Sequence, residues 1–168
     1  LCAHASYLIN LASNNAVTRK RSLVALMAEM RRADALGCHC LIMHPGAPKE
    51  DGAAVGIRRV AEGVRTMLEQ TADLKVRLAL ENTAGQGSVL GAYCKELAEM
   101  VQRIECPARV GVCLDSCHAF TAGIDLRQPA AVSLLAKELD QHLGLERVYV
   151  LHLNDSKTDC GSRIDRHQ

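Results

Sequence analysis

Histidine, aspartate and glutamate recur in this sequence at a regular spacing. Five of them each end a short apolar run, at intervals of 40, 37, 34 and 37 residues: His4, His44, Glu81, Asp115 and His152. Three more lie in polar stretches that follow such runs: His118, Asp165 and His167. Imidazole nitrogens and carboxylate oxygens together are ligands that Zn2+ and Mn2+ take in proteins. The set therefore predicts a metal site.

Eight ligands exceed what one tetrahedral site uses, so we expect two or three ions, with carboxylates such as Glu81 bridging them. Such clusters suit phosphoryl chemistry, because one ion prepares a hydroxide while others hold the phosphate and the leaving oxygen. Each residue alone has a plainer interpretation, since a histidine after a strand is commonly structural and an acid can cap the next helix. The repetition at equivalent strand ends favours a shared site.

The runs that carry these residues are short and apolar, as expected of buried parallel strands. We predict strands over residues 1–4, 38–43, 76–80, 110–114 and 147–151. Between them, apolar residues at helical spacing predict helices around residues 23–33, 57–68, 97–104 and 132–139. This alternation indicates parallel strands joined by crossover helices.

Two architectures satisfy the alternation, a doubly wound open sheet and a (β/α)8 barrel. Strand ends converge only near a switch point in an open sheet, whereas all of them meet at the C-terminal face of a barrel. Because every strand here ends in a residue able to bind metal, the barrel is favoured. A complete barrel needs roughly 200 residues or more. The 168 residues therefore predict one α/β domain over residues 1–168, a partial (β/α)8 TIM barrel whose remaining strands are either missing from the ends or supplied by partners.

Composition excludes several other classes of protein. The net charge of +1 shows no basic field for nucleic acid, although local patches can serve the same purpose. No apolar run approaches the roughly 18 residues of a membrane span, so we expect no membrane partner. The eight cysteines form no C-x-x-C pair, which favours buried, reduced thiols in a cytoplasmic protein over a disulfide framework.

Motifs in matching order make the sequence similar to the endonuclease IV family, the zinc-dependent apurinic/apyrimidinic (AP) endonucleases. The match runs nearly from end to end. It comprises His4–Asn10, His44–Gly46, Glu81–Gly87, Gly111–His118, His152–Lys157 and Gly161–His167. Ser116 is a mild departure, since the family more often has Thr there.

The resemblance implies a (β/α)8 barrel with about three Zn2+ ions in the complete protein, or Mn2+ in their place. His4, His44 and Glu81 would hold the first ion, Glu81, Asp115 and His152 the second, and His118, Asp165 and His167 the third. Such a deoxyribonuclease hydrolyses the phosphodiester 5′ to an abasic site in double-stranded DNA and leaves a 3′-hydroxyl. Glu81 and Asp115 would be catalytic through the ions, and Tyr7 and Leu8 match positions that probe the DNA.

By the same resemblance we expect a monomer acting on the nucleoid in the cytoplasm. The family's first two strands would precede Leu1, and its last strand, with a further glutamate ligand, would follow Gln168. We therefore expect this chain to be an internal part of such a protein. Unpaired sheet edges at both ends would make it poorly stable, and weakly active or inactive, on its own.

Two other functions stay open. A metal-dependent sugar isomerase or epimerase on a similar barrel also gathers His, Glu and Asp at strand ends, usually around one or two ions. The third set of ligands, His118, Asp165 and His167, argues against it. A degenerate barrel could instead bind damaged DNA without cutting it, but the complete ligand set argues against that function.

Overall fold

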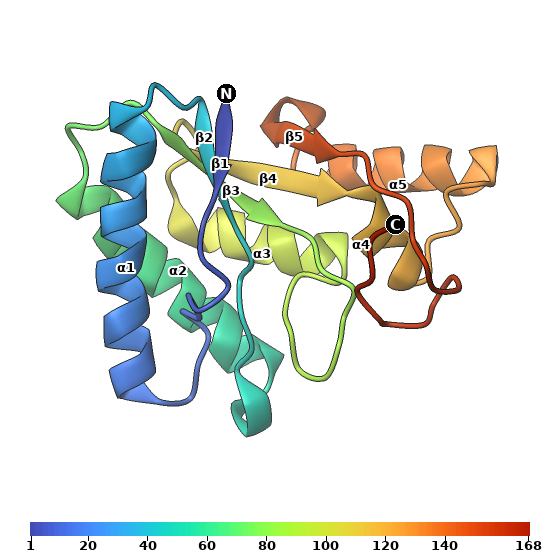
Figure 1. Cartoon of the computed structure of the whole chain (residues 1–168), viewed down its shortest axis with the longest axis horizontal. Coiled ribbons are helices and arrows are strands. Elements are labelled where there is room, and N and C mark those ends of the chain that lie inside the picture. Colours follow the sequence, from blue (N-terminus) through green and yellow to red (C-terminus); the bar gives the residue numbers. More distant parts are fainter.

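Five parallel strands, hydrogen-bonded in the order of the sequence, form one sheet (Figure 1). In this computed structural model, which describes residues 1–168, they are β1 (Cys2–His4), β2 (Cys40–Met43), β3 (Arg77–Glu81), β4 (Val110–Asp115) and β5 (Val148–His152). All five predicted strands are confirmed. The start predicted for β2 was two residues too early, because Cys38 and His39 lie before the strand, which begins at Cys40.

The strand order decides between the two predicted architectures. A doubly wound sheet reverses its order at a switch point. Here each strand pairs with the next one in the sequence, and the order never reverses. This is the wall of a partial (β/α)8 barrel, with β1 and β5 as its two edges.

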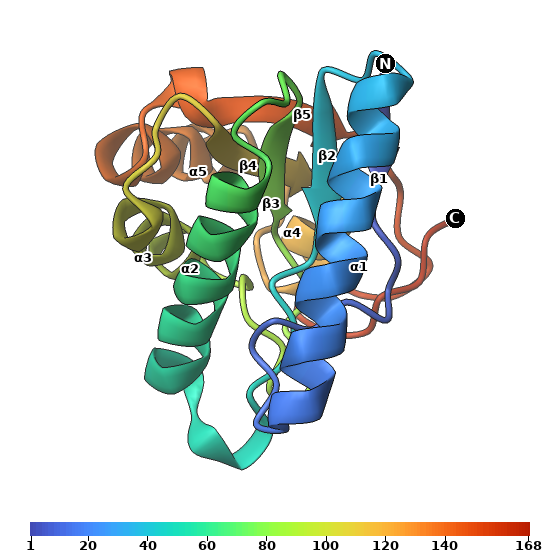
Figure 2. The ribbon, with the colours of Figure 1, turned by 90° about the vertical axis from the view of Figure 1, so that its left-hand side faces the viewer.

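Five α-helices accompany the strands: α1 (Ala16–Ala35), α2 (Ala53–Gln70), α3 (Cys94–Ile104), α4 (Ser116–Thr121) and α5 (Pro129–His142). Short 3-10 turns lie at Lys49–Asp51 and Leu145–Arg147. The long helices follow one another around one side of the sheet (Figure 2). The prediction of four helices was wrong by one, because the six residues of α4 are too few to show a helical period. No helix combines the length and hydropathy that a membrane span requires.

The two faces of the sheet bury different sets of residues. Side chains of a strand point alternately to opposite faces. Leu41 and Met43 therefore join Leu78 and Leu80 in the large core between the sheet and the helices. Each fully buried side chain of this size stabilises the fold by about 1.5–3 kcal/mol. On the other face a small cluster of Cys40, Ile42, Ala79 and Cys113 lines the inside of the barrel wall.

The same alternation places the predicted ligands. His44 lies two residues after Ile42, which faces the inside of the barrel, and Glu81 lies two residues after the inward-facing Ala79. Asp115 follows Cys113, and His152 follows Val150, in the same way. These four candidate ligands therefore lie at or directly after the inward-facing ends of their strands, where the apolar interior of the barrel ends.

Candidate metal centre

Glu81 lies at the middle of the site, on the last residue of β3. It is only 1% exposed. Its Oε2 lies 2.7 Å from His4 Nε2 and 2.9 Å from His44 Nε2. Its Oε1 lies 2.7 Å from His152 Nδ1. One buried carboxylate thus contacts histidines from three other strand ends.

These contacts change the proton affinities of the cluster. Burial alone would raise the pKa of Glu81, but the hydrogen bonds from His4 and His44 outweigh it and lower the pKa below its ordinary 4.5. The hydrogen bond to Glu81 in turn raises the pKa of His4 above its ordinary 6.5, although burial opposes the rise. The carboxylate is therefore ionised, and its surroundings favour a positive charge beside it.

Asp115 ends β4 and caps α4. Its Oδ1 accepts a hydrogen bond of 2.9 Å from the His118 N–H, as an N-cap residue does. Its Oδ2 accepts a hydrogen bond from the Asn154 side chain and lies 3.8 Å from His152 Nδ1. The cap fixes the first turn of α4, and with it the position of the buried His118 ring.

The loop after β5 returns to the end of β4 and brings the remaining two ligands (Figure 1). Asp165 Oδ2 lies 3.2 Å from His118 Nε2, and Asp165 Oδ1 lies 2.9 Å from His167 Nε2. A bridge between Ser156 and His167 closes this loop. Asp165 Oδ1 is buried and accepts no hydrogen bond, even from the nearby His167 ring.

A row of imidazoles joins the two groups of ligands. The centroid distance is 5.3 Å from His4 to His44, 5.4 Å from His44 to His118, and 5.3 Å from His118 to His167. The structure thus brings all eight residues proposed as ligands to one mouth at the carboxyl ends of the strands.

Sets of three donors able to share an ion lie within 4.8 Å of one another, and they differ in part from the predicted sets. His4, His44 and Glu81 form one set, as predicted. In a second set, Cys113 lies with Glu81 and His152, where Asp115 was predicted. Asp115 instead lies in a third set with His118 and His167. A fourth set joins Cys117 to Asp165 and His167. Burial raises the pKa of both the Cys113 and Cys117 thiols, which disfavours the thiolates that bind metal.

Tyr7 and Leu8 lie in the loop after β1, beside the ligands. They are 86% and 88% exposed. The Tyr7 ring lies 5.9 Å from the His4 ring and 6.1 Å from the His44 ring, by centroids. Tyr7, His4 and His44 line a cavity of about 200 Å³ together with neighbouring residues. Both side chains are therefore available to a ligand that approaches the mouth.

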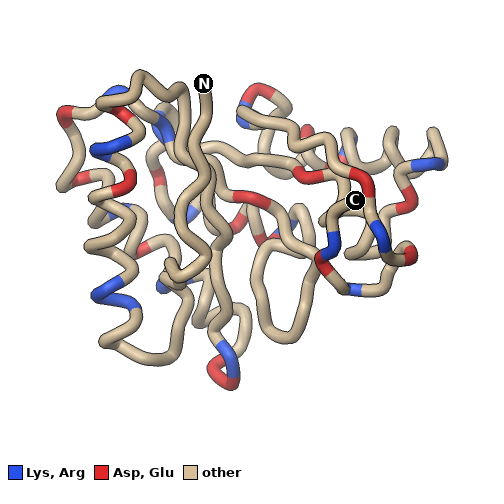
Figure 3. The backbone as a smooth tube through the Cα atoms, viewed as in Figure 1, with Lys and Arg blue, Asp and Glu red and all other residues tan.

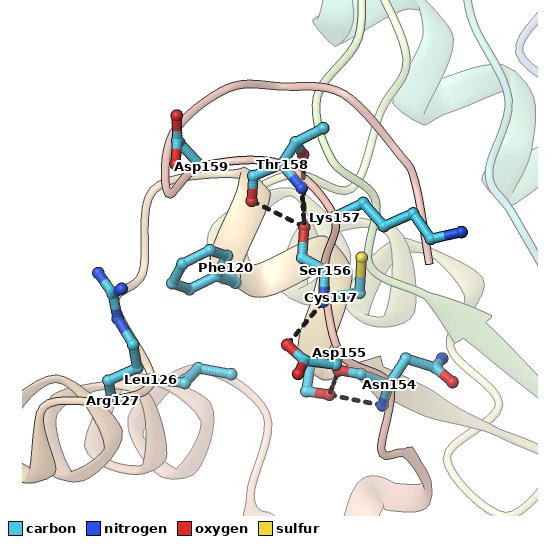
Figure 4. A pocket seen from close by; sticks show the side chains of 11 residues that line it. Cys117, Phe120, Leu126, Arg127, Asn154, Asp155, Ser156, Lys157, Thr158 and Asp159 are labelled. Atoms are coloured by element: carbon cyan, nitrogen blue, oxygen red, sulfur yellow. Dashed lines mark hydrogen bonds between the residues drawn. The ribbon is translucent and has the colours of Figure 1, made fainter. Parts of the chain in front are cut away.

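A second cavity, of about 370 Å³, lies between α4 and the loop after β5 (Figure 4). Its lining includes Ser116, Phe120, Asn154 and Lys157, but none of the eight candidate ligands. Basic and acidic residues are interspersed along the chain (Figure 3), in keeping with its small net charge.

Sequence reasoning missed Asn82 and Asn154. Asn82 pairs with the main chain of Asp115, and the Asn154 side chain donates to the Asp115 carboxylate. Each asparagine lies one or two residues after a candidate ligand, Glu81 or His152. Both also lie within motifs of the family resemblance, Glu81–Gly87 and His152–Lys157, but neither signal shows which groups the amides contact.

The sequence matches the family described as "Xylose isomerase-like TIM barrel" over residues 1–168. The chain belongs to this family. Within it, the sequence is 46% identical over 166 residues to "Probable endonuclease 4" of Halorhodospira halophila, covering 98% of this chain and 56% of that protein. It is 40% identical over 168 residues to the protein of the same name from Geobacter sulfurreducens, covering 100% and 57%. The resemblance to the endonuclease IV family is confirmed.

Comparison with solved structures agrees with this placement. Endonuclease IV from Thermus thermophilus superposes with a TM-score of 0.82 at 37% identity, covering 99% of this chain and 57% of that one. A D-tagatose 3-epimerase-like protein superposes with a TM-score of 0.77 at 23% identity, over 92% of this chain and 56% of that one, and at that identity shows the shared fold alone. The chain spans a little over half the length of the relatives it matches.

Proposed function

We propose that this chain carries most of the active site of a DNA-repair AP endonuclease. The reaction is hydrolysis of the phosphodiester 5′ to an abasic site in double-stranded DNA, leaving a 3′-hydroxyl. The observation that carries the proposal is the convergence of eight residues with nitrogen or oxygen donors, the buried Glu81 among them, at one mouth of the barrel wall. The similarity to proteins named endonuclease 4 supports the choice of chemistry.

The donor set fits a cluster of divalent ions, and we propose about three Zn2+, with Mn2+ as an alternative. Borderline cations of this kind take imidazole and carboxylate ligands. The orphaned, buried Asp165 Oδ1 lacks a partner that a cation would supply. The ions would be held by His4, His44 and Glu81, by Glu81, Asp115 and His152, and by His118, Asp165 and His167.

Ions held there would supply Lewis acidity toward a phosphoryl oxygen, toward an attacking water and toward the leaving oxygen. In the overall reaction the water oxygen bonds to phosphorus and the bond from phosphorus to the 3′-oxygen breaks. The 3′-oxygen leaves as a hydroxyl, and the phosphate stays on the abasic nucleotide. The chain's own contribution is a set of side chains held in place before the substrate binds.

Several residues would position the DNA. Tyr7 and Leu8 are exposed beside the ligands and would contact the duplex near the lesion. The cavity next to His4 and His44 offers room for a sugar turned out of the helix, which costs least where a base is already missing. We propose that the protein acts as a monomer on nucleoid DNA in the cytoplasm.

A chimera separates this function from incomplete folding. Residues 1–168 would replace the matching part of Thermus thermophilus endonuclease IV, and the chimera would be given zinc and a duplex with one abasic analogue. We expect incision 5′ to the lesion, and none of an undamaged duplex. The 168-residue chain by itself is expected to cut weakly or not at all. A folded, zinc-loaded chimera that leaves the abasic duplex intact would contradict the proposal.

Counting the ions tests the alternative of a sugar epimerase. The epimerase-like neighbour shares the fold at lower identity than the Thermus endonuclease. The proposed function requires about three zinc ions per chimera, whereas one or two would favour the isomerase or epimerase chemistry. Binding of abasic DNA without cleavage, at full zinc content, would favour a binding protein.

A further inference from the structure

Asn82 connects the end of β3 to the end of β4. It follows Glu81 and is only 5% exposed. Its N–H donates to the Cys113 carbonyl at 3.2 Å, which extends the pairing of the two strands. The Asn82 side chain also bonds to β4, through the main-chain groups of Asp115. Nδ2 donates to the Asp115 carbonyl at 3.0 Å, and Oδ1 accepts from the Asp115 N–H at 2.6 Å.

The main-chain carbonyl of Asn82 holds the His118 ring. This carbonyl oxygen lies 2.9 Å from His118 Nδ1, and because a carbonyl can only accept a hydrogen bond, Nδ1 must be the donor. The other ring nitrogen, Nε2, then points to Asp165. Histidines that bind metal characteristically donate their second nitrogen in this way, which fixes the orientation of the ring.

We propose that Asn82 is a positioning residue for the metal centre, one that sets the places of Asp115 and His118 at once. This inference rests on the proposed function, because it concerns the same ions. Its physical basis is that one buried residue bonds both the main chain of one candidate ligand and the ring of another. A side chain unable to pair with Asp115 lets the two strand ends separate, so the ligands no longer converge before an ion binds.

A purely structural role predicts a different result, and Asn10 is the matched control. The Asn10 side chain also pairs with both main-chain groups of one residue. Nδ2 donates to the Ala47 carbonyl at 3.2 Å, and Oδ1 accepts from the Ala47 N–H at 3.1 Å. Asn10 makes no hydrogen bond to a candidate ligand. Asn10→Leu and Asn82→Leu therefore remove the same kind of bonds in two different places.

The experiment measures two quantities on the chimera with Thermus thermophilus endonuclease IV, into which the substitutions are introduced. Thermal unfolding of the metal-free chimera gives stability, and competition with a chromophoric chelator gives stepwise zinc affinities at a temperature where every variant is folded. We expect both leucine variants to melt earlier than the unsubstituted chimera. Only Asn82→Leu is expected to weaken zinc binding, by about 10- to 100-fold. If it does not fold, Asn82→Ser, which is smaller but cannot span both groups of Asp115, takes its place.

Equal zinc affinities in a folded Asn82 variant and in the unsubstituted chimera would overturn the inference. So would an equal loss of affinity in Asn10→Leu, because destabilisation alone would then explain it. If the folded, unsubstituted chimera binds no zinc, the proposed function fails together with the inference. If it binds zinc and the Asn82 variants bind equally well, the inference alone fails.

Discussion

The candidate metal centre has two halves that the chain builds in different ways. One half surrounds Glu81, where His4, His44 and His152 come from or directly follow strands. The other surrounds His118, where Asp165 and His167 come from the loop after β5. The Glu81 side chain is almost fully buried, whereas those of Asp165 and His167 are 34% and 40% exposed.

This contrast shows how much of a site a β-sheet can place by itself. Five hydrogen-bonded strands hold the Glu81 half, so its backbone is fixed by the sheet. In the His118 half, hydrogen bonds to the end of β4 and to α4 hold the loop in place. We therefore expect the first half to be formed before any ion binds, and the second to depend more on the ion.

Glu81→Gln gives the largest expected effect, because Glu81 contacts three histidines and would hold two ions. In the chimera we expect cleavage of the abasic duplex to fall on the order of 1000-fold, since the amide forms a weaker ligand and lacks the charge. Zinc content should fall as well. Glu99→Gln, an exposed acid of α3 paired with Arg103, is the matched control and should cleave normally. Normal cleavage by Glu81→Gln would place the reaction elsewhere.

His167→Ala tests whether the second half is separable. We expect it to lose one zinc ion per chimera while the ions on the Glu81 side bind with unchanged affinity, because no contact links His167 to Glu81 directly. Metal analysis together with stepwise titration measures this. His142→Ala, at the end of α5 and outside the site, should keep all the zinc. A loss of every ion from His167→Ala would show that the two halves are one cooperative unit.

The stability of the metal-free chain should depend on pH through the Glu81 half. The pKa of Glu81 is lowered, so its contribution is present above its ordinary 4.5 and is lost as the pH falls toward the folded-state value. The pKa of His4 is raised, so its contribution is present below its ordinary 6.5 and is lost as the pH rises past the folded-state value. This pair is therefore most stabilising between about pH 4.5 and 6.5.

Thermal unfolding across pH measures this contribution. Each 1 kcal/mol should move the melting temperature by about 2–4 °C. Glu81→Gln removes the titration of Glu81 and the main cause of the raised His4 pKa, so the difference in melting temperature between it and the unsubstituted chain should peak within that window. A difference that stays constant with pH would show that the Glu81 and His4 pair does not contribute as a charged pair.

The contrast between the halves also explains what the sequence could predict. Alternation along the strands and a polar residue at each strand end were enough to locate Glu81, Asp115 and the histidines. The asparagine amides could not be found in the same way, because the residues that Asn82 and Asn154 contact lie more than thirty positions away in the sequence. The grouping of Asp115 with His118 depends on α4, a helix too short to predict.

Ser116 tests what holds the loop of the second half in place, and its expected effect is the smallest. Its Oγ donates to the Asn154 carbonyl at 2.7 Å and accepts from the Asn154 N–H at 2.8 Å, so it joins the end of β4 to the loop that carries Asp165 and His167. Ser116→Ala should lower the free energy of unfolding by about 1 kcal/mol. The substitution should lower the affinity for zinc on the His118 side by a few-fold and leave the affinity on the Glu81 side unchanged. Ser116→Thr keeps the hydroxyl and should bind zinc as the unsubstituted chain does. Equal zinc affinities in the alanine and threonine variants would show that the ion, rather than Ser116, holds this loop in place.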